Sequence, residues 1–307
     1  MLRIKQTNPM HSVQDLGRYG FAGQGVAKAG PMDSVAACWA NSCLGNAVTL
    51  PLLEIGGGGG FVAEFTKDVN LALTGAWGEM TLDGQPLPGP GAHPVSAGSV
   101  LRLGRFSSGM FSYLAVQGGF AIQPVLGSVS TCQRDSLGGL DGQGEPLSIE
   151  GNLPYQTAER RPVNLIPRRY LESYHQPLVC DVILRETDQF ASDATDLFFN
   201  QGYKVTREQS RMGYRLDGDL SIVAERPRYS VPIPLGGIQV PPSGQPIVLM
   251  RDHQSLGGYP MLGTLTRKSL GQLAQRRAGQ MVSFRAVSRE IAVQEFLQYR
   301  QFFGDFR

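Results

Sequence analysis

The feature that most constrains this fold is a succession of short apolar runs, each separated from the next by a turn rich in glycine or proline. The chain holds 39 glycines and 20 prolines among its 307 residues. In the first half, an Asp83-Gly84 pair between two apolar runs is typical of a β-hairpin turn. Regular short strands joined by such turns predict a barrel or a sandwich. The strands expected there lie at 69–74, 80–82, 100–103 and 111–116.

The second half repeats this pattern after a new β-strand at 178–184. Two apolar runs, at 236–240 and 246–250, flank a Pro-Pro-Ser-Gly turn and predict a pair of strands. Further strands are expected at 262–266 and 281–284. Helices are few. The first is predicted to have Pro31 at its first helical position, with Asp33 in the first turn, and to end at Gly45-Asn46. Others are predicted after a Thr187 cap, at Lys268 and after a Ser288 cap.

The length allows about two domains. A polar, proline-rich segment at 151–175 is the expected connection between them. We therefore predict an N-terminal domain at 1–172 and a C-terminal domain at 173–307. The fold class expected is mainly β with a few helices.

Composition excludes several classes of function. The net charge is only +2, from 28 basic and 26 acidic residues, which gives no support for nucleic acid or membrane-surface binding. No apolar stretch approaches the roughly 18 residues needed to span a bilayer, and the N-terminus lacks the apolar run of a signal peptide. The four cysteines show no metal-ligand spacing, so no metal site is predicted. We expect a cytoplasmic protein.

Two glycine-rich segments in the first half invite functional interpretations. Asp15 and Arg18 lie three residues apart in an irregular loop, where they form either a local ion pair or an anion site built on the arginine fork. The five glycines at 56–60 resemble a phosphate loop, but no Gly-Lys-Ser/Thr follows and a strand resumes at Phe61. A hairpin turn is the better interpretation of this run.

The richest polar stretch runs from residue 211 to 260. Arg211 and Arg215 open it, and Asp252 and His253 follow directly after the strand expected at 246–250. Polar groups clustered where a strand ends in a glycine-rich turn indicate a binding site, while a solvated turn remains the alternative.

Motifs spread along the chain resemble the family that includes the C subunit of 5-oxoprolinase, KipA and allophanate hydrolase subunit 2, often labelled biotin-dependent carboxyltransferases. The resemblance covers about residues 10–300. It rests on the Ser12-Val13-Gln14-Asp15-x-Gly17-Arg18-x-Gly20, Gly30-x-Met32-Asp33, Ala40-Asn41, Gly45-Asn46, Leu53-Glu54, Ser128-x-Ser130-Thr131, Gly138-Gly139-Leu140, Arg211-Met212-Gly213-Tyr214-Arg215-Leu216, Gly244-Gln245-Pro246 and Gly257-Gly258-Tyr259-Pro260 segments.

The resemblance implies a fold of two cyclophilin-like β-barrel domains. It also implies a subunit of an ATP-dependent 5-oxoprolinase, which opens the lactam of 5-oxo-L-proline to L-glutamate. The partners implied are a KipI-like B subunit and a LamB/YcsF-like A subunit. ATP is expected to be shared with a partner, Mg²⁺ is possible, and biotin is not expected. The alternatives are a KipA-like regulator that binds a KipI-like histidine-kinase inhibitor, and a carboxyltransferase or allophanate-hydrolase-type enzyme.

Under the first of these functions we assign catalytic roles to Asp15, Arg211 and Asp252. Substrate or anion binding is assigned to Arg18, Ser130, Thr131, Tyr214, Arg215, Gln245 and Tyr259. Positions that depart from the family pattern lie in loops where ligand contacts are expected, and they include Gln143, Ser210 and Leu256.

Overall fold

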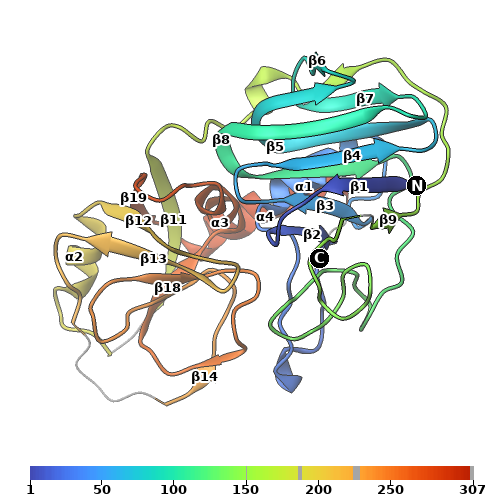
Figure 1. Cartoon of the computed structure of the whole chain (residues 1–307). Coiled ribbons are helices and arrows are strands. Elements are labelled where there is room, and N and C mark those ends of the chain that lie inside the picture. Colours follow the sequence, from blue (N-terminus) through green and yellow to red (C-terminus); the bar gives the residue numbers. More distant parts are fainter. Residues whose placement is uncertain (150, 186–188, 224–228, 305–307) are drawn as a thin grey trace. The chain divides into compact units, whose positions relative to one another are not determined.

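The computed structural model describes residues 1–307 except for 150, 186–188, 224–228 and 305–307 (Figure 1). The chain divides into two compact units. The N-terminal unit comprises Met1–Tyr19, Ala29–His175 and residues 302–304, and the C-terminal unit comprises Gly20–Lys28 and Gln176–Gln301. The domain limits at 1–172 and 173–307 stay a prediction. Residues 20–28 belong to the C-terminal unit, and residues 302–304 belong to the N-terminal unit.

The N-terminal unit is built on a ten-stranded antiparallel sheet, whose long central strands lie side by side in Figure 1. Its main path runs β10-β7-β5-β8-β4-β1-β9, while β2 and β3 pair with each other and β3 also pairs with β8. The strands are β1 (Leu2–Gln6), β2 (His11–Gln14), β3 (Leu52–Ile55), β4 (Phe61–Phe65), β5 (Val69–Leu82), β6 (Gln85–Pro86), β7 (Gly91–Val95), β8 (Val100–Val116), β9 (Asn152–Leu153) and β10 (Asn164–Leu165).

Two of these strands are much longer than the sequence pattern predicts. The runs expected as four separate strands form only β5 and β8, which pair along most of their length. Register shifts between Gly75 and Met80 bend the pair without ending it. Gly78 makes this possible, because a Cβ there would lie 2.2 Å from the Arg105 carbonyl oxygen. The Asp83-Gly84 hairpin is confirmed, with both residues at positive φ between β5 and β6.

Helix α1 (Ser34–Cys43) packs on the sheet over β5, β7 and β8. The Asp33 side chain caps it by accepting hydrogen bonds from the Val35 and Ala36 N–H groups. The expected start with Pro31 as the first helical residue is therefore wrong, because the cap places the first turn three residues later. The predicted end at Gly45 is confirmed, with φ +68° after the Leu44 cap. A 3₁₀ turn, η2 (Arg168–Tyr170), completes the helices described in this unit.

The five-glycine run connects β3 to β4, and the hairpin predicted for it is wrong. Both strands pair antiparallel with β8 at successive positions along it, so they run in the same direction. One glycine of the run tolerates no side chain. A Cβ on Gly59 would lie 1.7 Å from the Gly104 carbonyl oxygen, at φ +110°. Gly58 has a similar φ of +84°, yet a Cβ there would meet no atom within 4 Å. Substitutions at these two positions therefore distinguish the cost of a steric clash from the cost of backbone strain.

We expect Gly59→Ala to lower the free energy of unfolding by about 3 kcal/mol or more, because it adds a backbone clash to an unfavourable φ. Gly58→Ala should cost only about 1 kcal/mol, the strain of the left-handed region alone. Denaturant unfolding of both variants measures the difference. Equal losses would show that the close approach of Gly59 to Gly104 is not a constraint.

His11 lies fully buried beside this glycine run. Its Nδ1 accepts a hydrogen bond from the Asn8 backbone N–H, which leaves the proton on Nε2, 3.3 Å from the Gly59 carbonyl oxygen. The ring also meets Phe61 edge-on, at 5.5 Å between centroids. Burial lowers the pKa of His11 to about 4, although hydrogen bonds to backbone carbonyls oppose the shift.

This lowered pKa predicts a pH-dependent stability. The unfolded chain takes up the proton near pH 6.5, and the folded chain only near pH 4. The contribution of neutral His11 is therefore complete above pH 6.5 and is lost as the pH falls to 4, by roughly 3 kcal/mol. Unfolding free energies measured across this range should fall more steeply for the wild type than for His11→Gln. Parallel pH profiles would contradict the assignment.

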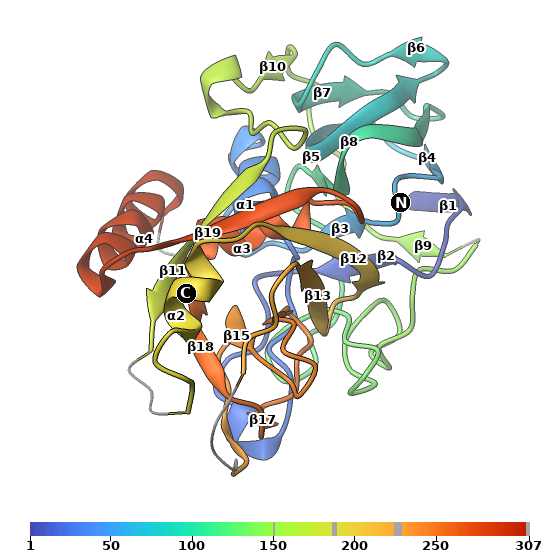
Figure 2. The same ribbon diagram turned by 90° about the vertical axis from the view of Figure 1, so that its left-hand side faces the viewer.

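The C-terminal unit is a closed seven-stranded barrel in the order β11-β18-β15-β16-β13-β12-β19, whose strands curve around one another in Figure 2. A two-stranded sheet of β14 and β17 accompanies it. The strands are β11 (Leu178–Leu184), β12 (Tyr203–Gln209), β13 (Gly213–Gly218), β14 (Val231–Pro232), β15 (Gly237–Gln239), β16 (Ile247–Leu249), β17 (Leu256–Gly257), β18 (Met261–Leu265) and β19 (Met281–Ala286).

The predicted strand pair around the Pro-Pro-Ser-Gly turn is confirmed as β15 and β16, with Gly244 at φ +75° and its N–H bonded to the Pro241 carbonyl. Helix α2 is shorter than expected, because its N-cap is Asp193. The Thr187 cap lies outside the described residues. The helices are η1 (Ala22–Gln24), α2 (Ala194–Phe199), α3 (Arg267–Ala274) and α4 (Arg289–Phe303).

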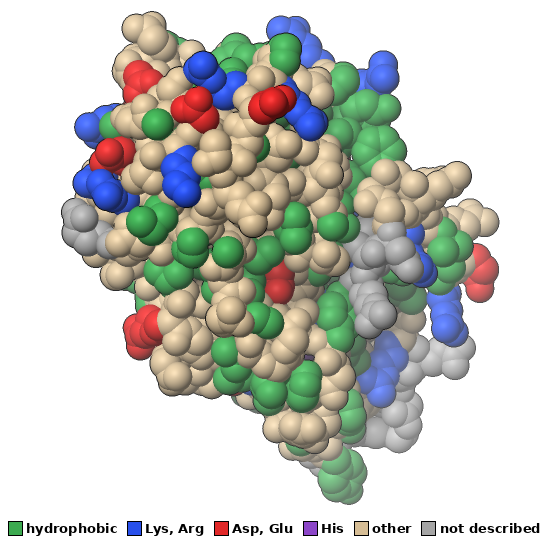
Figure 3. Space-filling model, turned by 90° about the vertical axis from the view of Figure 1, so that its right-hand side faces the viewer, with side chains coloured by type: hydrophobic (Ala, Val, Ile, Leu, Met, Phe, Trp, Pro, Cys, Tyr) green, Lys and Arg blue, Asp and Glu red, His purple; other side chains and the backbone are tan. Residues whose placement is uncertain are grey.

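The mainly β fold class is thus confirmed, and the C-terminal unit is a barrel as predicted. On the face in Figure 3, basic and acidic side chains are interspersed and neither forms a continuous patch. This agrees with the small net charge of the chain. No helix in the described part of the chain is long and apolar enough to cross a membrane.

Candidate functional site

The Asp15 carboxylate organises the loops of the N-terminal unit that carry the predicted site residues. It accepts hydrogen bonds from the Gly17 and Val129 N–H groups, both at 2.8 Å, and from the hydroxyls of Ser128 and Ser130. Four donors from two loops that are more than 110 residues apart in sequence meet on this one side chain. Its position indicates a residue that holds the loop after β2 against the loop at 125–131.

Arg18 reinforces the same connection. Its guanidinium is buried and donates to the carbonyl oxygens of Val125, Ser128 and Ser130, the last at 2.6 Å. Gly138 must be glycine here, because it has φ +72° and a Cβ would lie 2.1 Å from the Ser130 carbonyl oxygen and 2.3 Å from Arg18 Nη2. An anion would have to compete with these three carbonyl groups, so the geometry favours a positioning role for Arg18.

Ser130 and Thr131 are brought to the same place, as predicted. The Ser130 hydroxyl lies 2.7 Å from the Asp15 carboxylate, and the Thr131 hydroxyl donates to the Val13 carbonyl at 3.0 Å. Both side chains are buried. The sequence therefore identified a real cluster of Asp15, Arg18, Ser130 and Thr131, whose binding roles stay predictions.

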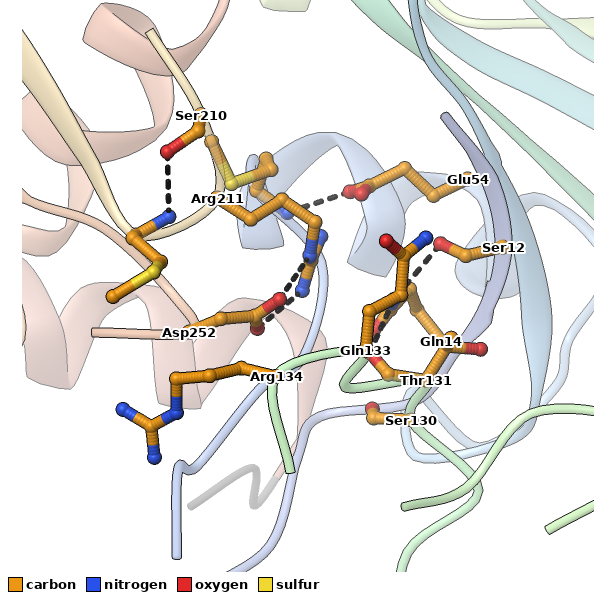
Figure 4. A network of polar contacts seen from close by, with 12 residues as sticks. Ser12, Gln14, Glu54, Ser130, Thr131, Gln133, Arg134, Ser210, Arg211 and Asp252 are labelled. Atoms are coloured by element: carbon orange, nitrogen blue, oxygen red, sulfur yellow. Dashed lines mark hydrogen bonds and ion pairs between the residues drawn. The ribbon is translucent and has the colours of Figure 1, made fainter. Parts of the chain in front are cut away.

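Two buried polar groups in this unit, Gln14 and Glu54, lie within the family motifs but were assigned no role from sequence. Gln14 is fully buried and donates to Ser12 and to the Thr131 carbonyl, but its Oε1 has no hydrogen-bond partner among the described residues (Figure 4). Glu54 accepts from the Met32 N–H at 2.6 Å and from the Tyr113 hydroxyl. Buried, unsatisfied acceptors are rare, so the Gln14 amide oxygen is a candidate for contact with a ligand donor.

In the C-terminal unit the central feature is an ion pair between Arg211 and Asp252. Arg211 follows β12, and Asp252 lies three residues after the end of β16. The guanidinium forms a two-pronged contact with the carboxylate, at 2.7 Å and 2.9 Å, and the two side chains face each other in Figure 4. The Asp252 N–H also donates to the Arg211 carbonyl at 2.7 Å. Two predicted catalytic residues are thus direct partners.

The remaining predicted residues of the barrel are dispersed. Tyr214 is buried and its hydroxyl donates to the Ala274 carbonyl, and the Gln245 amide bonds both backbone groups of Gly218. Arg215 pairs with the exposed Glu208 at 2.9 Å, and Tyr259 is exposed. Tyr214 and Gln245 therefore support the barrel, and the structure leaves Arg215 and Tyr259 as accessible groups.

Sequence comparison identifies the family. The model of the carboxyltransferase domain, subdomain A and B, matches residues 24–286. The chain belongs to this carboxyltransferase-domain family. Its relatives include the 5-oxoprolinase C subunit of Haemophilus influenzae, 34% identical over 293 residues, with 94% of this chain and 92% of the relative covered. The Escherichia coli C subunit is 35% identical over 309 aligned positions, with 99% and 96% covered.

A solved structure shares the fold of this chain. The urea amidolyase of K. lactis matches with a TM-score of 0.89 over all of this chain, at 24% sequence identity. This chain covers only 20% of that protein. The domain therefore occurs both as a chain of this length, in the two bacterial relatives, and as one part of a much longer polypeptide.

Proposed function

We propose that this chain is the C subunit of an ATP-dependent 5-oxoprolinase, which opens the lactam of 5-oxo-L-proline to L-glutamate. The observation that carries the proposal is the similarity to proteins named as this subunit. The chain is 34–35% identical to two of them, and the alignments cover more than nine-tenths of this chain and of each relative. Membership of such an enzyme implies further subunits, and we propose a KipI-like B subunit and a LamB/YcsF-like A subunit as these partners.

The chemistry explains why such an enzyme needs charged donors. An unstrained lactam is a poor electrophile, and phosphorylation of its oxygen converts a bad leaving group into a good one. Arginine side chains and backbone N–H groups stabilise the negative charge that develops. In this chain Arg211 is fixed by Asp252, so its guanidinium is pre-oriented, while Arg215 remains accessible beside Glu208.

Features suited to ATP or Mg²⁺ are sparse among the described residues. The glycine run at 56–60 joins two strands that both pair with β8, and it lacks the Gly-Lys-Ser/Thr of a phosphate loop. The described residues contain no group of three or more His, Cys, Asp or Glu side chains suited to a metal. We therefore propose that nucleotide and Mg²⁺ bind at a site completed by a partner subunit.

A carboxyltransferase acting on a urea-type substrate is the second candidate, because the family model carries that name. The chain itself has no Met-Lys-Met biotin-carrier segment, so a separate chain would have to supply biotin. A KipA-like regulator is the third candidate. It would bind a KipI-like inhibitor and carry out no chemistry.

A substrate comparison separates these functions. The chain is co-expressed with its cognate A and B subunits, and ATP hydrolysis is measured with 5-oxo-L-proline and with urea. The proposal predicts that 5-oxo-L-proline stimulates ATP hydrolysis and that urea does not. Transfer of the carboxyl group from added carboxybiotin to urea, releasing biotin without ATP hydrolysis, would favour the carboxyltransferase. A stable complex that hydrolyses ATP with neither substrate would favour the regulator.

A further inference from the structure

A cluster of aromatic rings lies partly exposed on the surface of the N-terminal unit. Trp39 of α1 is at its centre, with its ring centroid 5.3 Å from that of Tyr170 and 5.1 Å from that of Phe302. The rings of Tyr170 and Phe302 are themselves 5.9 Å apart, and Phe303 meets Trp39 edge-on at 5.4 Å. All four residues belong to this unit. Three segments that are far apart in the chain therefore meet in one cluster.

The outer rings of this cluster are open to solvent. Tyr170 is 40% exposed and Phe302 is 55% exposed, and Leu171, which follows Tyr170 in the chain, is 39% exposed. By contrast, Phe198, which contacts three other rings in the C-terminal unit, is fully buried. Single exposed apolar side chains are ordinary, but a group of them in contact marks a surface that another protein covers. We call Trp39, Tyr170 and Phe302 the aromatic patch.

Two exposed arginines in η2 directly precede Tyr170 of the patch. They are Arg168 and Arg169, and the guanidinium carbon of Arg169 lies 4.8 Å from the centroid of the Tyr170 ring. Among the described residues, neither side chain is paired with a carboxylate. Aromatic and arginine side chains are the groups that contribute most to protein interfaces. A surface complementary to this one carries carboxylates beside apolar side chains.

The charge of this surface discriminates between the proteins that could cover it. A second copy of the chain is a poor occupant, because a symmetric dimer through the patch would bring Arg168 and Arg169 of both copies together without counter-ions. A different protein can supply the missing carboxylates. The relatives named as C subunits of 5-oxoprolinase are parts of a larger enzyme, so part of their surface must bind other subunits.

We propose that the aromatic patch, together with Arg168 and Arg169, is a docking surface for a partner subunit. The partner segment presents carboxylates to the two arginines and an aliphatic or aromatic side chain to the exposed rings. This inference rests on the proposed function, since it takes the partner to be a subunit of the same enzyme. Sequence reasoning assigned residues 151–175 only to a connection between domains, because spacing does not show that Tyr170 meets Trp39.

The test measures binding of the full chain to its cognate A and B subunits, each added separately, by isothermal titration calorimetry. Two variants change the docking surface: Phe302→Ser and the double variant Arg168→Glu/Arg169→Glu. Leu297→Ser is the matched control for the first, because Leu297 lies on the same helix, α4, and is 51% exposed. Arg102→Glu, at an exposed position of β8, is the control for charge reversal. Denaturant unfolding of every variant shows whether the fold is retained.

We expect the wild type to bind one of the two subunits, and both docking-surface variants to bind it roughly tenfold more weakly or worse, with unfolding midpoints close to that of the wild type. The two control variants should bind as the wild type does. Added salt should weaken wild-type binding, and the double variant should lose much of this salt dependence.

Three results would overturn the proposal. If the wild type binds a subunit and the docking-surface variants bind as tightly as their controls, the docking surface is wrong while the proposed function stands. If the wild type binds neither subunit, both fail. If the chain alone forms a dimer that Phe302→Ser abolishes, a second copy covers the patch in place of a partner subunit.

Discussion

Arg211→Ala is expected to lower the free energy of unfolding of the barrel unit by about 3 kcal/mol, because it leaves the Asp252 carboxylate largely buried without its two-pronged partner. The Asp252 side chain is only 7% exposed, so water cannot replace the guanidinium. Denaturant unfolding monitored by a probe in the C-terminal unit measures the loss. The double variant Arg211→Ala/Asp252→Ala should recover part of it, since no unpaired charge remains.

The barrel offers a matched control in the Arg215–Glu208 pair. These side chains are 39% and 72% exposed, so Arg215→Ala should change the stability by less than about 1 kcal/mol. Equal losses in Arg211→Ala and Arg215→Ala would contradict the structural importance assigned to the Arg211–Asp252 pair. If Arg211→Ala still assembles with the partner subunits but loses activity, Arg211 would also have a role in ligand binding.

Asp15→Asn is expected to destabilise the N-terminal unit by about 3 kcal/mol. The substitution removes the charge that receives four hydrogen bonds, and the new NH₂ group faces donors of its own kind. Hydrogen exchange of the Gly17 and Val129 amides should accelerate in parallel with the loss of unfolding free energy.

Asp141→Asn is the control for this prediction. Asp141 is exposed in the same loop region, and the hydrogen bond described for its carboxylate is a local one from the Gln143 N–H. Its amide variant should stay within about 0.5 kcal/mol of the wild type. Similar behaviour of the two variants would show that Asp15 does not organise these loops.

Local signals in the sequence predicted local structure well. The Asp83-Gly84 hairpin, the turn that ends at Gly244 and the helix end at Gly45 all depend on residues that adopt positive φ, and each is confirmed. Strand length was predicted less well. Bulges near Gly78 keep β5 and β8 continuous across residues that interrupt the apolar pattern, and no short-range signal reveals this.

The candidate site, too, was predicted only in part. Sequence identified Asp15, Ser130, Arg211 and Asp252 as notable, but not the pairing among them. Asp15 meets Ser130 across 115 positions of the chain, and Arg211 meets Asp252 across 41. Such contacts depend on the sheet and barrel topology, which propensity and spacing do not contain. The pairing also changes the interpretation, since Asp15 emerges as an organiser of loops.

The most direct test of the proposed function omits this chain from the assembled enzyme. The cognate A and B subunits are assayed for ATP-dependent release of L-glutamate from 5-oxo-L-proline, with and without this protein. We predict that glutamate forms only when all three chains are present. Glutamate release at the same rate without this chain, or none with the full set of cognate subunits, would contradict its assignment as a 5-oxoprolinase subunit.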